Sequence, residues 1–237
     1  MELPDVSDRL RDAVDRLRFG GSVAHVYNPL NYARGPHHEY LARFGAGRKA
    51  VLLVGMNPGP FGMAQTGVPF GDVAMVRDWL GVRGRVGRPR HEHPKRPVLG
   101  FDCPRREISG TRLWGWARDR FATPTNFFRR FFVWNYCPLM FLDEGGRNVT
   151  PDKIAVSARV RLDAVCDEAL RSIVAALQPQ WVVGVGAFAE SSARRALDGR
   201  DVRIGRILHP SPASPIANRG WAKRAEAELA GLGVALP

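Results

Sequence analysis

Three polar side chains suited to hydrogen-bond chemistry each follow an apolar run with the composition of a buried strand: Asn57, Asn135 and His209. An asparagine amide offers two N–H donors and an oxygen acceptor, and a neutral imidazole offers one donor and one acceptor. In open parallel sheets, ligands bind outside the carboxyl ends of the strands. We therefore expect these three side chains to meet in one pocket, although they are far apart in the sequence.

The first of these residues lies in a long uncharged loop, GMNPGPFGMAQTGVPFG, at residues 55–71. Its prolines and glycines define its shape, so Phe70 near its end is expected to be held rigidly. A rigid aromatic ring suits stacking on a planar ligand, and each stacked nucleobase contributes ~1–3 kcal/mol. The loop is therefore a candidate pocket for an uncharged aromatic ring.

Asn135 ends an unbroken apolar and aromatic run. A buried amide without a partner costs ~1–3 kcal/mol, so it either pairs within the core or faces a ligand. A matching ligand edge carries an acceptor and a donor side by side. Uracil has such an edge, at O4 and N3–H.

Strand and helix patterns alternate along the chain, which favours parallel pairing with helices on both faces of a sheet. The predicted class is α/β, a three-layer α/β/α domain spanning residues 1–237 around a central, mostly parallel four-stranded sheet. Strands are expected at 50–54, 130–139, 181–186 and 202–210. Helices are expected at 6–19, 72–81, 112–121, 151–178 and 215–229, with a further helix after the third strand and a basic loop at 83–106.

The charge balance points to a polyanionic partner. The chain has 35 Lys and Arg against 23 Asp and Glu, a formal net charge of +12, and nucleic acid is the first candidate. No apolar run approaches the ~20 residues of a membrane span, and the N-terminal segment has no leader pattern, so we expect no membrane association. Three widely spaced cysteines favour a reducing compartment. We expect the cytoplasm or nucleoid in a bacterium and the nucleus in a eukaryote.

Several common chemistries lack their residues in this chain. No paired carboxylates stand at the strand ends, no serine elbow is present, and no phosphate loop or dinucleotide fingerprint follows a strand. The HEHP segment at 91–94, with Cys103 downstream, matches no standard zinc spacing. We therefore expect neither a metal nor a cofactor.

The loop at 55–71, HPSP at 209–212 and NRGW at 218–221 together closely resemble the single-strand-selective monofunctional uracil-DNA glycosylases. The segments VYNPLNYA, HPKRPVLGF, EISGTRLWGW and FFVWNYCPL extend the resemblance over much of the chain. It implies a uracil-DNA glycosylase-like fold and a DNA repair enzyme. Such an enzyme flips uracil out of single- or double-stranded DNA and hydrolyses its N-glycosidic bond, leaving an abasic site. The resemblance also implies that C5-oxidised uracils such as 5-hydroxymethyluracil are substrates.

The resemblance assigns roles to particular residues. By it, Asn57 positions the attacking water and His209 stabilises the departing uracil anion. The residues implied to bind the base are Gly55, Met56, Gly59, Met63, Phe70 and Asn135. The residues implied to contact DNA, as a wedge that enters the duplex, are Ser211, Pro212, Ala213, Ser214 and Arg219. DNA is the expected partner, and the protein is expected to be a monomer.

Two positions depart from the family pattern. Ala213 stands in the wedge where a basic residue is expected, and Trp134 precedes Asn135 where animal members have histidine. The sequence also leaves two alternatives open. One is a superfamily glycosylase acting mainly on deaminated purines such as hypoxanthine and xanthine, and the other is a non-catalytic protein that binds single-stranded DNA.

Overall fold

The computed structural model describes residues 2–236. Its central sheet has four parallel strands in the order β3-β2-β6-β7. These are β3 (Phe131–Asn135), β2 (Val51–Gly55), β6 (Trp181–Val185) and β7 (Arg203–Ile207). The predicted α/β class and the predicted sheet are confirmed, and all four strands are parallel.

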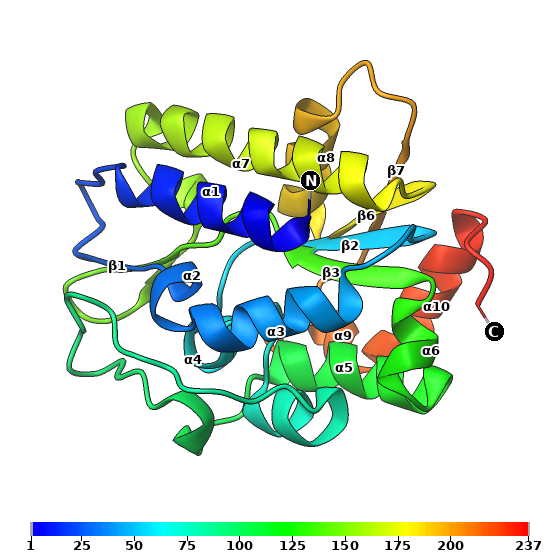
Figure 1. Ribbon diagram of the computed structural model, residues 1–237, viewed down its shortest axis with the longest axis horizontal. Helices are drawn as coiled ribbons and strands as arrows, with labels where there is room; N and C mark the ends of the chain where they lie inside the picture. Colours follow the sequence, from blue (N-terminus) through cyan, green and yellow to red (C-terminus); the bar gives the residue numbers. More distant parts are fainter. Residues whose placement is uncertain (1, 237) are drawn as a thin grey trace.

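Helices cover both faces of this sheet and make the three layers visible in Figure 1. One layer contains α1 (Leu3–Asp15), α7 (Val156–Leu177) and α8 (Ala187–Ala196). The other contains α3 (Arg34–Phe44), α5 (Ile108–Phe121), α6 (Pro124–Phe128) and α10 (Trp221–Gly231). Because both faces are covered, every residue of β2 and β3 is buried, which explains their continuous apolar sequences.

A second, smaller sheet was not predicted from the sequence. Its strands are antiparallel, in the order β1-β4-β5, and comprise β1 (His25–Tyr27), β4 (Met140–Leu142) and β5 (Asn148–Val149). The strand expected at 130–139 therefore ends at Asn135, and the chain turns before it enters β4. Strands of two or three residues are too short for alternation to reveal them.

Several predicted helix boundaries were wrong. The first helix ends at Asp15, α5 begins at Ile108, and a 3₁₀ turn at Pro151–Lys153 precedes α7. Residues Met75–Leu80 form a π-helical stretch that ends at Gly81, whose φ is +67°. The single helix expected at 215–229 is two, α9 (Pro215–Asn218) and α10, separated at Gly220. The short α2 (Pro29–Tyr32) and α4 (Met63–Thr66) were not predicted, and neither were α3 and α6.

The parallel sheet brings the carboxyl ends of its strands to one edge. In the register, Gly55 at the end of β2 lies opposite Asn135 at the end of β3. The loops that leave this edge carry Asn57, Phe70 and His209. Among residues 2–236, no helix is both long and apolar enough to cross a membrane.

Candidate active site

Two predicted site residues, Asn135 and Phe70, meet directly over a third, Gly55. A Cβ atom added at Gly55 would lie 2.3 Å from Asn135 Oδ1 and 2.6 Å from Phe70 Cε2. The amide of β3 and the ring from the long loop thus converge where β2 ends. Any side chain at this position would force both groups to move.

The Asn135 amide keeps most of its hydrogen-bonding capacity free. Its side chain is 4% exposed, and its Nδ2 donates to Met63 Sδ at 3.2 Å, a weak acceptor. No hydrogen bond within residues 2–236 engages Asn135 Oδ1. The amide edge therefore has both an oxygen and an N–H to offer a ligand, and Met63 lies beside it.

Phe70 is held in a constrained backbone conformation, as the loop composition predicts. Its φ is +53°, in the left-handed region that residues other than glycine rarely adopt. Trp114 Nε1 donates to the Pro69 carbonyl at 3.2 Å, and Thr66 Oγ1 donates to the Gly71 carbonyl at 3.1 Å. These bonds fix the backbone on both sides of Phe70, so its ring is placed before any ligand arrives.

A single hydrogen bond sets the orientation of Asn57. Its Nδ2 donates to the Leu139 carbonyl at 3.1 Å. Since a carbonyl can only accept, the amide nitrogen must face Leu139, and Oδ1 points the other way. The side chain is half-buried, so this oxygen is available to accept a hydrogen bond from water.

His209 follows β7 and is held through its neighbour Leu208. Trp221 Nε1 donates to the Leu208 carbonyl at 2.6 Å, and the Leu208 N–H donates to Glu228 Oε2 at 2.6 Å. The imidazole centroid lies 6.0 Å from that of Phe70, so the histidine belongs to the same cluster. Burial lowers the pKa of His209 to about 4. The imidazole is therefore neutral at physiological pH and can still donate one N–H.

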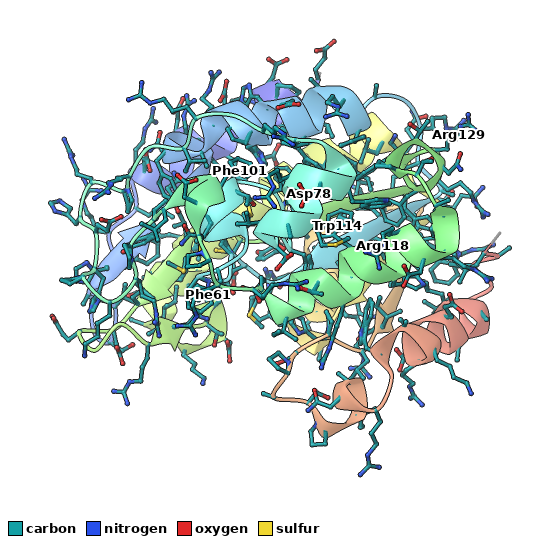
Figure 2. All side chains as sticks on the ribbon, turned by 90° about the horizontal axis from the view of Figure 1, so that it is seen from below. Phe61, Asp78, Phe101, Trp114, Arg118 and Arg129 are labelled. Atoms are coloured by element: carbon teal, nitrogen blue, oxygen red, sulfur yellow. The ribbon has the colours of Figure 1, made fainter. Side chains whose placement is uncertain are left out.

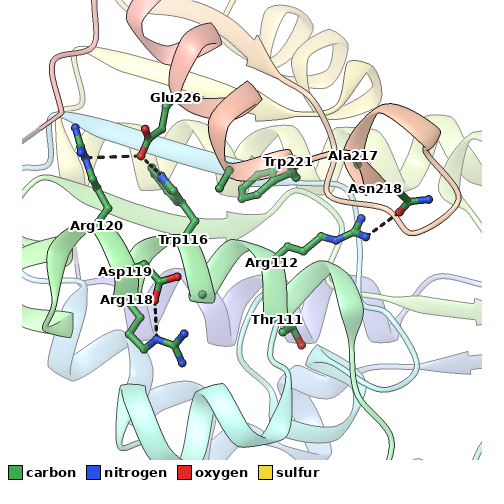
Figure 3. Close-up of a pocket in the computed structure, with 13 residues that line it drawn as sticks. Thr111, Arg112, Trp116, Arg118, Asp119, Arg120, Ala217, Asn218, Trp221 and Glu226 are labelled. Atoms are coloured by element: carbon green, nitrogen blue, oxygen red, sulfur yellow. Dashed lines mark hydrogen bonds and ion pairs between the residues drawn. The ribbon is translucent and has the colours of Figure 1, made fainter.

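The loop after His209 is held by hydrogen bonds from an arginine that was not predicted as a site residue. Arg112 of α5 donates to the carbonyls of Pro210 and Ser211 at 3.1 and 3.2 Å, and to Asn218 Oδ1 at 2.8 Å. Asn218 Nδ2 in turn donates to the Pro212 carbonyl at 3.0 Å. Figure 3 shows the Arg112–Asn218 contact in a cleft between α5 and the segment carrying α9 and α10. None of the residues predicted to bind the base lines that cleft.

The predicted DNA-contacting residues lie in and beside this fastened loop. Pro212, Ala213 and Arg219 are exposed. Ser214 caps α9, accepting at its Oγ from the Ala217 N–H at 3.3 Å, and Ser211 Oγ accepts from the Ala213 N–H at 3.2 Å. The loop therefore projects small and apolar side chains from a backbone that is hydrogen-bonded internally.

Glu107 is a second residue that sequence reasoning missed. Cβ atoms added at Gly59 and Gly62 would lie 2.4 Å from its Oε2 and 2.8 Å from its Cγ, so the carboxyl packs against the loop that carries Asn57. Burial raises the pKa of Glu107 above its usual range. In the sequence it is one acid within a basic segment, and nothing in that pattern signals the contact.

Trp134 lies away from the pocket. Successive strand residues point to opposite faces, so Trp134 and Asn135 diverge, and the indole centroid lies 5.7 Å from that of His37 in α3. Trp134 Nε1 and His37 Nε2 are both buried without a hydrogen-bond partner among residues 2–236. The departure at Trp134 therefore changes the packing behind β3, and the polarity of the pocket is set by other residues.

In the HEHP segment, the His93 imidazole pairs with backbone groups, and His91 contributes its backbone carbonyl to a contact with His25. His93 Nε2 lies 3.1 Å from the Glu144 carbonyl, and His93 Nδ1 accepts from the Lys95 N–H at 3.0 Å. The His91 carbonyl lies 3.1 Å from His25 Nδ1. Within the described residues, no group of three or more His, Cys, Asp or Glu side chains is placed to hold a metal ion.

The sequence and the fold of this chain both match those of known proteins, and the sequence match gives the superfamily. The family model for the uracil DNA glycosylase superfamily matches residues 42–229. The crystal structure of wild-type SMUG2 from Pedobacter heparinus shares the fold, with a TM-score of 0.64 and 16% identity over 96% of this chain and 97% of that one.

Two curated relatives show to which family within the superfamily the chain belongs. The single-strand selective monofunctional uracil DNA glycosylase of Bos taurus is 52% identical over 95% of this chain and 84% of its own length. The Rattus norvegicus protein of that name is 51% identical over 95% of this chain and 82% of its own. The chain therefore belongs to the uracil-DNA glycosylase superfamily and, within it, to the single-strand selective monofunctional family.

Proposed function

We propose that this protein excises uracil from DNA by hydrolysing the bond between the base and the deoxyribose, leaving an abasic site. One observation carries the proposal: Asn135 and Phe70 converge over Gly55 at the edge of the sheet from which Asn57 and His209 also emerge. The curated relatives named for this activity support it.

In the proposed complex, the base is recognised by its hydrogen-bonding edge and its ring face. Asn135 donates from Nδ2 to uracil O4 and accepts at Oδ1 from N3–H, while Phe70 stacks on the ring. The loop at 55–71 contains no charged residue, which suits a neutral base. Gly55 and Met56 form the floor, and Gly59 and Met63 bound the C5 side, where we propose that a hydroxymethyl group also fits.

Bond cleavage in this proposal depends mainly on stabilising the leaving group. Negative charge grows on the uracil ring as the bond stretches, and a donor aimed at that charge acts selectively on the transition state. His209, neutral because it is buried, supplies such an N–H at uracil O2. Loss of one donor of this kind typically costs ~10²–10³ in rate. Asn57 accepts a hydrogen bond from the water that captures the sugar cation.

DNA is held outside the pocket by the exposed surface around the sheet edge. The loop containing Ser211, Pro212, Ala213 and Ser214, with Arg219 beyond it, fills the space left by the flipped nucleotide. Extrusion of a base costs a few kcal/mol and least for an unpaired one, so single-stranded DNA is the easier substrate. We propose that the protein acts as a monomer, because Asn57, Phe70, Asn135 and His209 converge within one chain.

A panel of oligonucleotides tests this function. Each carries one uracil, 5-hydroxymethyluracil, thymine, hypoxanthine or xanthine, as a single strand and as a duplex, and abasic sites are scored by alkaline cleavage. We expect release of uracil and 5-hydroxymethyluracil, with little release of thymine. Preferential release of the purines, or binding without any base release, would refute the proposal.

A further inference from the structure

Next to the candidate active site, two arginines share one aromatic ring. Arg105 Cζ lies 4.2 Å from the ring centroid of Phe61, and Arg96 Cζ lies 5.7 Å from it. We call Phe61, Arg96 and Arg105 the arginine fork. A guanidinium over an aromatic face is attracted by the ring quadrupole, so the ring helps to fix both side chains. Figure 2 shows Phe61 on the side of the molecule away from Arg129.

The backbone that carries the fork is tied together by a buried glutamine. Gln65 Nε2 donates to the carbonyls of Pro60 and Pro97, at 2.9 and 3.1 Å. Gln65 Oε1 accepts from the N–H groups of Leu99 and Gly100, at 2.8 and 3.1 Å. One side chain, 2% exposed, thus joins the loop of Phe61 to the segment that follows Arg96. The backbone that carries Phe61 and Arg96 is therefore fixed before any ligand binds.

The positive charge of the fork is not neutralised within the protein. No ion pair within residues 2–236 involves Arg96 or Arg105, whereas many other arginines pair with a carboxylate. In the part of the chain that the structure describes, Arg96 Nη1 donates only to the Lys95 carbonyl, at 3.2 Å, and Arg96 Nε is buried without a partner. Two unpaired cations beside one ring raise the local positive potential, which favours the binding of an anion. Planar guanidinium groups match the oxygens of a phosphate.

The position of the fork indicates which phosphate it meets. Phe61 follows Asn57 by four residues in one loop, and four extended residues reach at most about 14 Å. A nucleotide bound at Asn57 therefore places the neighbouring phosphates of its own strand within reach. The position of the fork therefore fits a phosphate of the DNA backbone. A site for a free anion could lie at any distance from the pocket.

We propose that Arg96 and Arg105, aligned on Phe61, bind one backbone phosphate of the damaged strand within a few nucleotides of the flipped uracil. This proposal rests on the proposed function, because it takes the strand's position from the base in the pocket. This contact would let the protein bind the damaged strand in the absence of a second strand. The fork thereby compensates on single strands for a wedge loop that lacks a basic residue at Ala213.

A phosphate-neutralisation scan tests the fork. Single-stranded oligonucleotides with one uracil carry a methylphosphonate at one of the three phosphates on either side, and binding and uracil release are measured for each. For the wild-type protein we expect one position to weaken binding about tenfold, the usual effect of losing a charge-assisted contact. Arg105→Ala should weaken binding of the unmodified strand to a similar extent and should reduce the sensitivity at that position to the part that Arg96 supplies.

Matched variants distinguish phosphate binding by the fork from a general effect of positive charge and from base stacking on Phe61. Arg200→Ala removes an exposed arginine at the opposite edge of the sheet and should keep the wild-type scan. The slope of log affinity against log salt should fall by about 0.7 for Arg105→Ala on single strands. Phe61→Leu keeps both arginines but not the ring, and it should reduce the effect at the same position.

Two outcomes would overturn the fork. The first is an Arg105→Ala scan that matches those of the wild-type protein and Arg200→Ala. The second is a Phe61→Leu protein that keeps its sensitivity to methylphosphonate but loses its sensitivity to removal of a base next to the uracil. That result would mean that Phe61 stacks on a base and does not align the arginines. If the wild-type protein releases no uracil, the proposed function fails, and the binding scan still decides whether the fork holds phosphate.

Discussion

The amide nitrogen of Asn57 donates to the carbonyl of Leu139 at 3.1 Å, which turns the amide oxygen of Asn57 toward the open side of the loop. Leu139 lies just beyond the strand that carries Asn135, so one hydrogen bond links the residue that we propose positions the water to the strand that we propose recognises the base. In the proposed mechanism, residue 57 must donate to Leu139 and accept from water at the same time, and an amide carries both the donor and the acceptor.

Replacement of Asn57 tests this contact. Asn57→Ala should lower single-turnover uracil release by at least about 100-fold, because the water loses its position. Asn57→Asp should also be slower than the wild-type protein, since a carboxylate cannot donate to Leu139. Thermal unfolding serves as the control for folding. An Asn57→Asp protein as fast as the wild-type protein would show that the donation to Leu139 is dispensable.

His209 should act as a neutral donor throughout the neutral pH range. Burial lowers its pKa to about 4, so the single-turnover rate should stay level from about pH 8 down to about pH 6. His209→Ala should reduce the rate by ~10²–10³ at every pH in that range. A wild-type rate that changes with an inflection near the ordinary histidine pKa would indicate that the charged imidazole matters instead.

Gly55 should tolerate no side chain. In Gly55→Ala, the new Cβ would overlap Asn135 Oδ1 and the Phe70 ring, and both groups must move. We expect loss of most uracil release and about 1–3 kcal/mol of destabilisation from overpacking. Gly20→Ala is the matched control, because nothing lies within 4 Å of a Cβ there. Equal activity of the two variants would contradict the convergence of site residues over Gly55.

Arg112 should matter more on duplex than on single-stranded DNA. Its hydrogen bonds fix the backbone of the loop at 210–212 and Asn218, which we propose fills the gap left by the flipped base. Arg112→Ala should therefore lower kcat/KM for uracil in a duplex about tenfold more than for a single strand. Arg118→Ala, on the same helix and paired with its neighbour Asp119, is the control. An equal loss on both substrates would mean that Arg112 supports only the overall fold.

Stability should decrease as the solution is acidified below the ordinary histidine pKa. Burial lowers the pKa of both His37 and His209 from 6.5 to about 4. The unfolded chain therefore takes up protons between these values while the folded protein does not, and the free energy of unfolding falls with falling pH. His209→Asn should flatten this dependence when unfolding is followed in urea. An unchanged slope would show that the surroundings of His209 do not lower its pKa.

The placement of Asn57, Asn135 and His209 could be predicted because apolar runs reveal buried strands, and parallel strands end at one edge. The alternation of side chains along a strand also indicates that Trp134 faces away from the pocket when Asn135 faces it, since two successive residues cannot both face the pocket. Arg112 and Glu107 could not be found in this way. Each acts through contacts with residues distant in sequence, Arg112 with Asn218 and Glu107 with Gly59, and such contacts leave no periodic pattern.

The central claim is that the residues gathered at the carboxyl edge of the sheet release uracil by hydrolysis. Its most direct test is the time course of free uracil released from a single-stranded oligonucleotide, measured by mass spectrometry with the strand analysed in parallel. The wild-type protein should release the base and leave the strand intact until alkali is added. The double variant Asn57→Ala, His209→Ala should release none while keeping its fold. Release by that variant at the wild-type rate would contradict the account.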